Sequence, residues 1–112
     1  MITTHVLDTS RGRPAARVPV VLERQDSQSV WETIGRGETD ADGRLRSLIE
    51  KGSSFPPGIY RLVFDTRRYF TADDIATFYP HVVIVFETTA GEAHYHVPLL
   101  ISPFGYSTYR GS

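Results

Sequence analysis

The 112-residue chain contains no cysteine, so disulfide bonds, thiol nucleophiles and thiolate metal ligands are all excluded. It has no surplus of basic side chains, which nucleic-acid binding normally requires, because 12 Lys and Arg stand against 13 Asp and Glu. Its longest apolar run, Val82–Phe86, is far shorter than the roughly 20 residues of a membrane-spanning helix. The first residues have neither the basic start nor the apolar stretch of a signal peptide. We therefore expect a cytoplasmic protein that binds neither membranes nor nucleic acid.

What the sequence does contain is a succession of short segments in which apolar and polar residues alternate. Tyr60, Leu62 and Phe64 fall on one face of an extended chain, and so do Val18, Val20 and Leu22. This pattern predicts strands near residues 3–8, 17–25, 30–37, 44–50, 59–66, 81–89, 92–101 and 105–110. Strands at this spacing, separated by turns that contain Gly or Pro, predict a single domain, residues 1–112, folded as an antiparallel β-sandwich.

One segment between two predicted strands has a helical pattern instead. Thr71 and Asp74 have the spacing of a capping pair at the start of a helix. Ile75 and Phe78 follow at helical spacing, and Pro80 would end the helix. We therefore predict one short helix that begins near Thr71 and stops before Pro80.

The run Val82–Phe86 is apolar at every position, which predicts a strand without fixing its place in a sheet. A central strand that is covered on both faces would explain the run. An edge strand that pairs with a second copy of the chain would explain it equally well, because unprotected apolar edges recruit partners. Both alternatives stay open.

The four histidines, His5, His81, His94 and His96, have side chains whose ordinary pKa, about 6.5, suits proton transfer at neutral pH. His94 and His96 lie two positions apart, so on a strand they share a face. Two imidazoles on one face can bind a metal or act in catalysis, although such pairs are often purely structural. A zinc site would need a third ligand, from His5 or His81, and no spacing in the chain requires one. We therefore expect no metal.

Two further segments place polar side chains where they could line a site. The turn Thr39–Gly43 aims Arg44 toward whatever cavity the next strand borders, although a single arginine is usually a solvated surface charge. The end of the chain keeps a strand-like pattern with tyrosines, where termini are normally polar and frayed. Either this end is an edge strand with a flexible tip, or Tyr109, Arg110 and Ser112 bind a polar substrate.

Three stretches of the sequence carry a resemblance to a known family. They are Thr4–Asp8 with Gly12–Ala15, then Thr39–Arg44, and finally His94–Leu100 followed by the terminal Tyr109–Ser112. Together they resemble the motifs of the 5-hydroxyisourate hydrolases among the transthyretin-like proteins, from the first predicted strand to the last residue. The His-Tyr-His segment and the terminal tetrapeptide are the specific parts, since transthyretin carriers share the fold but lack both.

The resemblance implies an all-β fold: a transthyretin-like (prealbumin-like) sandwich of two four-stranded sheets with one short helix. It implies a homotetramer whose active sites lie in a channel between dimers. The implied activity is the hydrolysis of 5-hydroxyisourate to 2-oxo-4-hydroxy-4-carboxy-5-ureidoimidazoline (OHCU) in urate degradation, by a cyclic-amide hydrolase that needs neither a metal nor another cofactor. By matching motif positions, the resemblance assigns catalysis or substrate binding to His5, Arg44, His96, Tyr109, Arg110 and Ser112.

The chemistry of these residues agrees with that activity. Hydrolysis of a cyclic amide needs an acceptor for the water proton, stabilisation of the oxyanion, and a donor for the leaving nitrogen. We expect His5 or His96 to deprotonate the water, and the sequence does not decide between them. Arg44 would hold the ring and its oxyanion, since a guanidinium is a fixed cation with forked donors. Tyr109 and Ser112 would orient the water and the substrate.

Three other functions remain as alternatives. A non-catalytic carrier of the transthyretin type would bind a small aromatic ligand in the same channel. A structural sandwich would bind only other proteins. A metallohydrolase would use His5, His94 and His96 as ligands, whereas the hydrolase hypothesis makes His94 a neighbouring group of the site.

Overall fold

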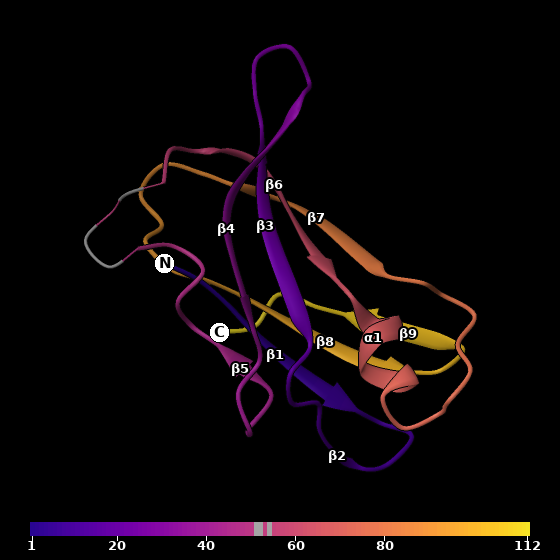
Figure 1. Ribbon diagram of the computed structural model, residues 1–112. Helices are drawn as coiled ribbons and strands as arrows, with labels where there is room; N and C mark the ends of the chain where they lie inside the picture. Colours follow the sequence, from indigo (N-terminus) through magenta and orange to yellow (C-terminus); the bar gives the residue numbers. More distant parts are fainter. Residues whose placement is uncertain (51–52, 54) are drawn as a thin grey trace.

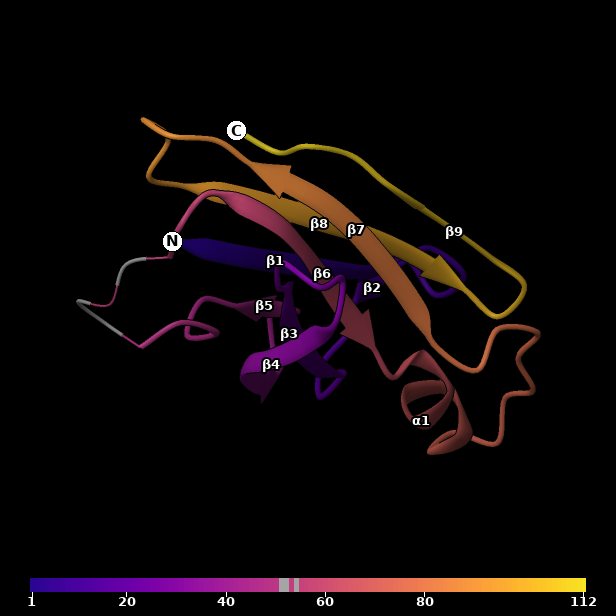
Figure 2. The same ribbon diagram turned by 90° about the horizontal axis from the view of Figure 1, so that it is seen from above.

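The computed structural model describes residues 1–50, 53 and 55–112, which form two β-sheets and one short helix (Figure 1). The elements are β1 (Ile2–Asp8), β2 (Arg13–Pro14), β3 (Pro19–Gln25), β4 (Trp31–Glu38), β5 (Arg44–Leu45), β6 (Gly58–Phe64), α1 (Thr66–Thr71), β7 (Val82–Thr88), β8 (Tyr95–Ser102) and β9 (Gly105–Thr108). The helix lies at the end of the molecule away from both termini (Figures 1 and 2). Among residues 1–50, 53 and 55–112, no helix is long and apolar enough to cross a membrane.

The strands form the two layers that the sequence predicts. One sheet has the order β4-β3-β6-β7, and the other has the order β2-β1-β8-β9, with β5 also paired to β1. The second sheet therefore has five strands where four were expected, because the two-residue strands β2 and β5 both pair with β1. One pair departs from the predicted antiparallel arrangement: β1 and β8 run parallel, which places the beginning of the chain beside its last long strand.

The core between the sheets consists of the side chains that alternation assigned to it. Tyr60, Leu62 and Phe64 on β6 are fully buried, as is Leu22 on β3. Each such side chain contributes about 1.5–3 kcal/mol relative to an exposed one. The second sheet contributes Ile2, Val6, Tyr95, Val97, Leu99 and Ile101 to the same core. The opposite face of β1 and β8 is therefore free to carry polar groups.

The predicted position of the helix is wrong. The helix spans Thr66–Thr71 and ends where the sequence predicted it to begin. Asp65 caps it, because its carboxylate accepts a hydrogen bond from the backbone N–H of Arg68 at 3.1 Å. Phe70 is buried and anchors this turn against the core. The segment containing Phe78 is tied instead to the second sheet, where its N–H donates to the Pro103 carbonyl at 2.9 Å.

Two strands differ in extent or placement from their predictions. The predicted strand 44–50 is regular only over Arg44–Leu45. The run Val82–Phe86 belongs to β7, which lies at the edge of its sheet, so a central strand covered on both faces is wrong. Val82 is buried in the core, whereas Val85 is 57% exposed on the other face.

Asp8, at the end of β1, joins the five-stranded sheet to the helix. Its buried carboxylate accepts hydrogen bonds from Ser10, from Arg11 and from the hydroxyl of Tyr69 on α1, the last at 2.8 Å. Arg11 continues the network to Asp73, at 2.6 Å. Burial alone would raise the pKa of Asp8, but the hydrogen bonds outweigh it and lower this pKa to about 2.

Candidate active site

His5 and His96 both lie on the outer face of the five-stranded sheet. Successive side chains of a strand point to opposite faces, so His5 on β1 points outward while Val6 enters the core. On β8 the same alternation sends Tyr95 inward and His96 outward. β1 and β8 pair in parallel, with Thr3 opposite His96. His5 lies two positions after Thr3 and so shares its face, which puts the imidazoles of His5 and His96 on the same side of the sheet although the two residues are far apart in sequence.

The short strand β5 brings Arg44 to the same face. Arg44 pairs with His5 in the antiparallel β1–β5 ladder. The preceding turn fixes this register, because the Val6 N–H donates to the Gly43 carbonyl at 2.7 Å. Gly43 has φ +76°, and a Cβ there would lie 2.4 Å from the Val6 carbonyl oxygen, so glycine is required.

Asp40 stabilises this turn. Its carboxylate accepts hydrogen bonds from the backbone N–H groups of Arg44 at 3.0 Å and Asp42 at 2.9 Å. The bond from the Arg44 N–H is the main cause that lowers the pKa of Asp40, and it holds the backbone of Arg44 in place. The ion pairs among the described residues do not include the Arg44 guanidinium. This side chain is therefore available to a ligand.

Hydrogen bonds orient both imidazoles. Nε2 of His5 lies 2.9 Å from the Asp42 carbonyl oxygen, which can only accept, so this nitrogen carries the proton. In the neutral ring, Nδ1 of His5 then has a free lone pair. Nδ1 of His96 lies 2.8 Å from the hydroxyl oxygen of Thr3. Its Nε2 has no hydrogen-bond partner among residues 1–50, 53 and 55–112.

The surroundings of His96 favour its neutral form. Burial lowers the pKa of His96, and the positive charge of Arg44 lowers it further, followed by smaller contributions from His5, His94 and Arg46. An imidazole whose pKa lies below its ordinary 6.5 is neutral at pH 7 and can accept a proton. His96 therefore has the protonation state of a general base.

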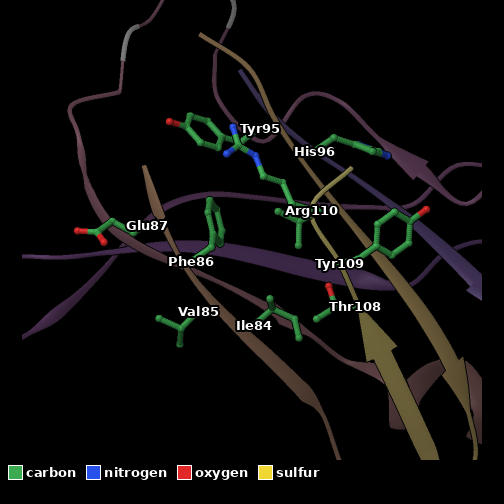
Figure 3. Close-up of a pocket in the computed structure, with 10 residues that line it drawn as sticks. Ile84, Val85, Phe86, Glu87, Tyr95, His96, Thr108, Tyr109 and Arg110 are labelled. Carbon is green, nitrogen blue, oxygen red and sulfur yellow. The ribbon is translucent and has the colours of Figure 1, made fainter. Parts of the chain in front are cut away.

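The carboxyl-terminal tip runs past His96. The N–H of Gly111 donates to the His96 carbonyl at 2.8 Å, so the terminal Ser112 follows directly beside this residue. Tyr109 is 60% exposed and extends to the same side of β9 as the His96 ring (Figure 3). Next to them, the edges of β7 and β9 border a groove of about 240 Å³.

Arg110 takes the opposite direction. Its guanidinium lies over the Tyr95 ring, 5.1 Å from the ring centre (Figure 3). The guanidinium also lies 3.9 Å from the carboxylate of Glu92. Because Tyr95 and His96 point to opposite faces of β8, the Arg110 side chain does not join the imidazole face. The structure thus places His5, Arg44 and His96 on one face with Tyr109 beside them, and Ser112 follows Gly111 at the chain end next to His96. The Arg110 guanidinium is directed away from this face.

The other two histidines have different surroundings. His94 immediately precedes β8, with Nε2 3.4 Å from the Thr3 hydroxyl, so it is a neighbour of the site. His81 lies on the outer face of the other sheet, beside Glu23 and Arg36, and cannot be a third ligand with His5 and His96. Within the described part of the chain, no group of three or more His, Asp or Glu residues is arranged to hold a metal ion.

Sequence reasoning missed two contributors to the site. Thr3 lies two positions before His5 on β1, so the alternation that placed His5 could have placed Thr3 on the same face. The Asp42 carbonyl is a backbone group whose direction depends on the turn, and no side-chain pattern signals it.

This architecture, a two-sheet sandwich with a His–Arg cluster on the outer face of one sheet, defines a transthyretin-like protein with a candidate acid–base site. The family model described as "HIUase/Transthyretin family" matches residues 2–111. The chain belongs to this family.

Curated relatives and solved structures agree with this assignment. The 5-hydroxyisourate hydrolase of Salmonella typhimurium is 44% identical, over 100% of this chain and 81% of that protein. The uric acid degradation bifunctional protein TTL of Arabidopsis thaliana is 45% identical, over 99% of this chain and 37% of that protein. The crystal structure of sea bream transthyretin in complex with thyroxine superposes with a TM-score of 0.91 and 34% identity, covering 98% of this chain and 93% of that one.

Proposed function

We propose that this protein hydrolyses 5-hydroxyisourate to OHCU, as a step of urate degradation. The observation that carries the proposal is the convergence of His5, Arg44 and His96 on one sheet face beside the chain terminus. The hydrolase names of its relatives, at 44% identity over the whole chain, supply the substrate. The carrier alternative has less support, because the identity to the transthyretin structures is 34%, whereas the identity to the hydrolase is 44%.

His96 is the general base in this proposal. Its neutral imidazole, with a free Nε2, takes a proton from the water that attacks the ring carbonyl carbon. The water oxygen bonds to that carbon, the C–N bond of the cyclic amide breaks, and the leaving nitrogen takes up a proton. The His96 imidazolium that forms gives this proton to the leaving nitrogen and returns to its neutral state. His5, whose Nε2–H is held by the Asp42 carbonyl, can accept a hydrogen bond from the substrate at its free Nδ1.

Arg44 binds the planar ring and stabilises the oxyanion. Its guanidinium is a permanent cation that has no carboxylate partner among the described residues, so its donors can face the substrate. Loss of one donor to an oxyanion typically costs about 10²–10³-fold in kcat. Tyr109 and Ser112 orient the substrate beside His96, while a substrate contact for Arg110 stays a prediction.

In the single chain, the outer face of the five-stranded sheet is open to solvent. This exposure supports assembly into a homotetramer, in which the face would become the wall of a channel. Tyr109 on the face and Val85 on the edge strand β7 are both more than half exposed.

Hydrolysis without a metal is also part of the proposal, and exhaustive chelation should leave the activity unchanged. A loss of activity that added Zn²⁺ restores would instead favour a metallohydrolase. The cytoplasmic location stays a prediction from the sequence.

The decisive test follows the ultraviolet absorbance of freshly prepared 5-hydroxyisourate. His96→Asn and Arg44→Gln should each lower kcat/KM by at least about 100-fold, since each removes a group that acts in the transition state. His81→Asn and Arg36→Gln are matched controls on the other sheet and should retain the activity of the parent protein. Near-parental turnover in both site variants would contradict the mechanism. Binding of the purine-derived ring without turnover would favour a carrier.

A further inference from the structure

Thr3 has a position that no motif signalled. It lies on β1 opposite His96, and its side chain shares the outer face with the imidazoles. Its hydroxyl oxygen lies 2.8 Å from Nδ1 of His96 and 3.4 Å from Nε2 of His94. Thr3 is only 5% exposed, so water competes little for this hydroxyl. One hydroxyl therefore bridges the two histidines of the specific His-Tyr-His segment.

A bridging hydroxyl links the protonation of the two rings. It has a single proton, so it donates to one ring nitrogen and accepts from the other. If it accepts from Nδ1–H of His96, then Nε2 of His96 carries a lone pair; the opposite direction puts the proton on Nε2.

The charges around His96 decide between these directions. The groups that face His96 are Arg44 and Arg46 at β5, His5 on β1, His94 just before β8, and Tyr109 just after β9. The cationic groups in this set favour a lone pair on the exposed ring nitrogen over an N–H bond with its positive end outward. The Thr3 hydroxyl then accepts from His96 and donates to His94.

We propose that Thr3 is a positioning residue for the hydrolysis: its hydroxyl accepts the Nδ1–H of His96 and holds the unprotonated Nε2 toward the substrate. This inference rests on the proposed function, because it concerns the same base. Thr3 itself does not touch the substrate, so its loss should lower kcat and leave KM nearly unchanged. A hydrogen bond to an imidazolium is stronger than one to a neutral ring, so its loss should also lower the pKa of His96.

The kinetic test compares Thr3→Val, which removes the hydroxyl at constant shape, with Thr3→Ser, which keeps it. Thr3→Val should lower kcat about tenfold or more and shift the acidic limb of the kcat/KM profile to lower pH. Thr3→Ser should stay within about threefold of the parent protein. Thr4→Val is the matched control, because Thr4 donates to the Val97 carbonyl at 2.6 Å on the core side of the same strand. It should lower stability without moving the pH profile.

Nitrogen-15 NMR of the His96 ring tests the inference without substrate. The parent protein should carry the neutral-ring proton on Nδ1, and Thr3→Val should transfer part of this population to Nε2. A proton on Nε2 in the parent protein would overturn the inference, even if Thr3→Val failed to fold. An unchanged tautomer in Thr3→Val, or equal losses of kcat in the Val and Ser variants, would also overturn it. If the parent protein failed to hydrolyse 5-hydroxyisourate, the proposed function would fall while the NMR result still decided the role of the hydroxyl.

Discussion

Gly111→Ala should inactivate the protein through one added methyl group. Gly111 holds the terminal residues against His96 by donating its N–H to the His96 carbonyl. A Cβ at this position would lie 2.5 Å from Cδ2 of the His96 ring and 3.2 Å from its Cγ. The backbone of Gly111 has no positive φ, so alanine meets an obstacle in the imidazole and not in its own conformation.

The size of the expected loss of activity follows from the steric overlap between the added Cβ and the His96 ring. Non-bonded carbon atoms normally approach to about 3.5–4.0 Å, so the ring or the tip must move by about 1 Å. A moved ring loses its 2.8 Å contact with the Thr3 hydroxyl, and a moved tip loses the bond from the Gly111 N–H. A displacement of about 1 Å at a reacting group can cost about 100-fold in rate. We therefore expect kcat/KM to fall by about 100-fold.

The assay is 5-hydroxyisourate turnover measured beside urea denaturation. Stability should change by less than about 1 kcal/mol, because the substitution lies near an exposed chain end. Gly105→Ala is the matched control on the neighbouring hairpin, since a Cβ there would meet only the Ser102 hydroxyl oxygen, at an ordinary 3.6 Å. Turnover of Gly111→Ala within about threefold of the Gly105→Ala value would refute the reasoning, because the tip would then not constrain His96.

Two further predictions concern the framework of the site. Gly43→Ala should cost about 3 kcal/mol in urea unfolding, from positive φ and from the clash with the Val6 carbonyl, whereas Gly12→Ala, with φ +65° in open space, should cost about 1 kcal/mol. Equal costs would show that the clash is relieved freely. Asp8→Asn should cost about 2 kcal/mol at pH 7, because the folded-state pKa of about 2 lies below the ordinary 3.8. This stabilisation is complete above about pH 4 and is lost as the pH falls through 2. The free energies of unfolding of the parent protein and Asp8→Asn should therefore converge in acid. A difference between them that stays constant with pH would contradict the hydrogen-bonded, ionised state of Asp8.

Most of the fold could be predicted from local patterns. Burial of Tyr60, Leu62 and Phe64 follows from alternation, because a two-residue period fixes which side chains face the core. The helix was misplaced because two capping patterns compete in one segment. The Asp65 cap prevails because it allows Phe70 to be buried, a tertiary contact that local spacing does not reveal.

The candidate site was predictable in its members but not in its geometry. Alternation assigned His94 and His96 to one face, and the resemblance selected His5, Arg44 and the terminal residues. The direction of Arg110 depends on its packing over the Tyr95 ring, which no periodicity encodes. The bonds that orient the imidazoles depend on a turn carbonyl and on a hydroxyl of the neighbouring strand, so they require the assembled sheet.

The parallel pairing of β1 with β8 is the feature from which the site derives. An antiparallel hairpin joins residues that are close in sequence, whereas a parallel pair requires a long crossover connection. Here the connection is most of the chain and includes every strand of the other sheet, so His5 and His96 are brought together by pairing between two distant parts of the sequence. The two imidazoles and Arg44 are therefore positioned by backbone hydrogen bonds of a completed core rather than by a flexible loop. In this arrangement, a small steric change at Gly111 or the loss of one hydroxyl at Thr3 acts directly on the base, because both residues lie against the His96 ring.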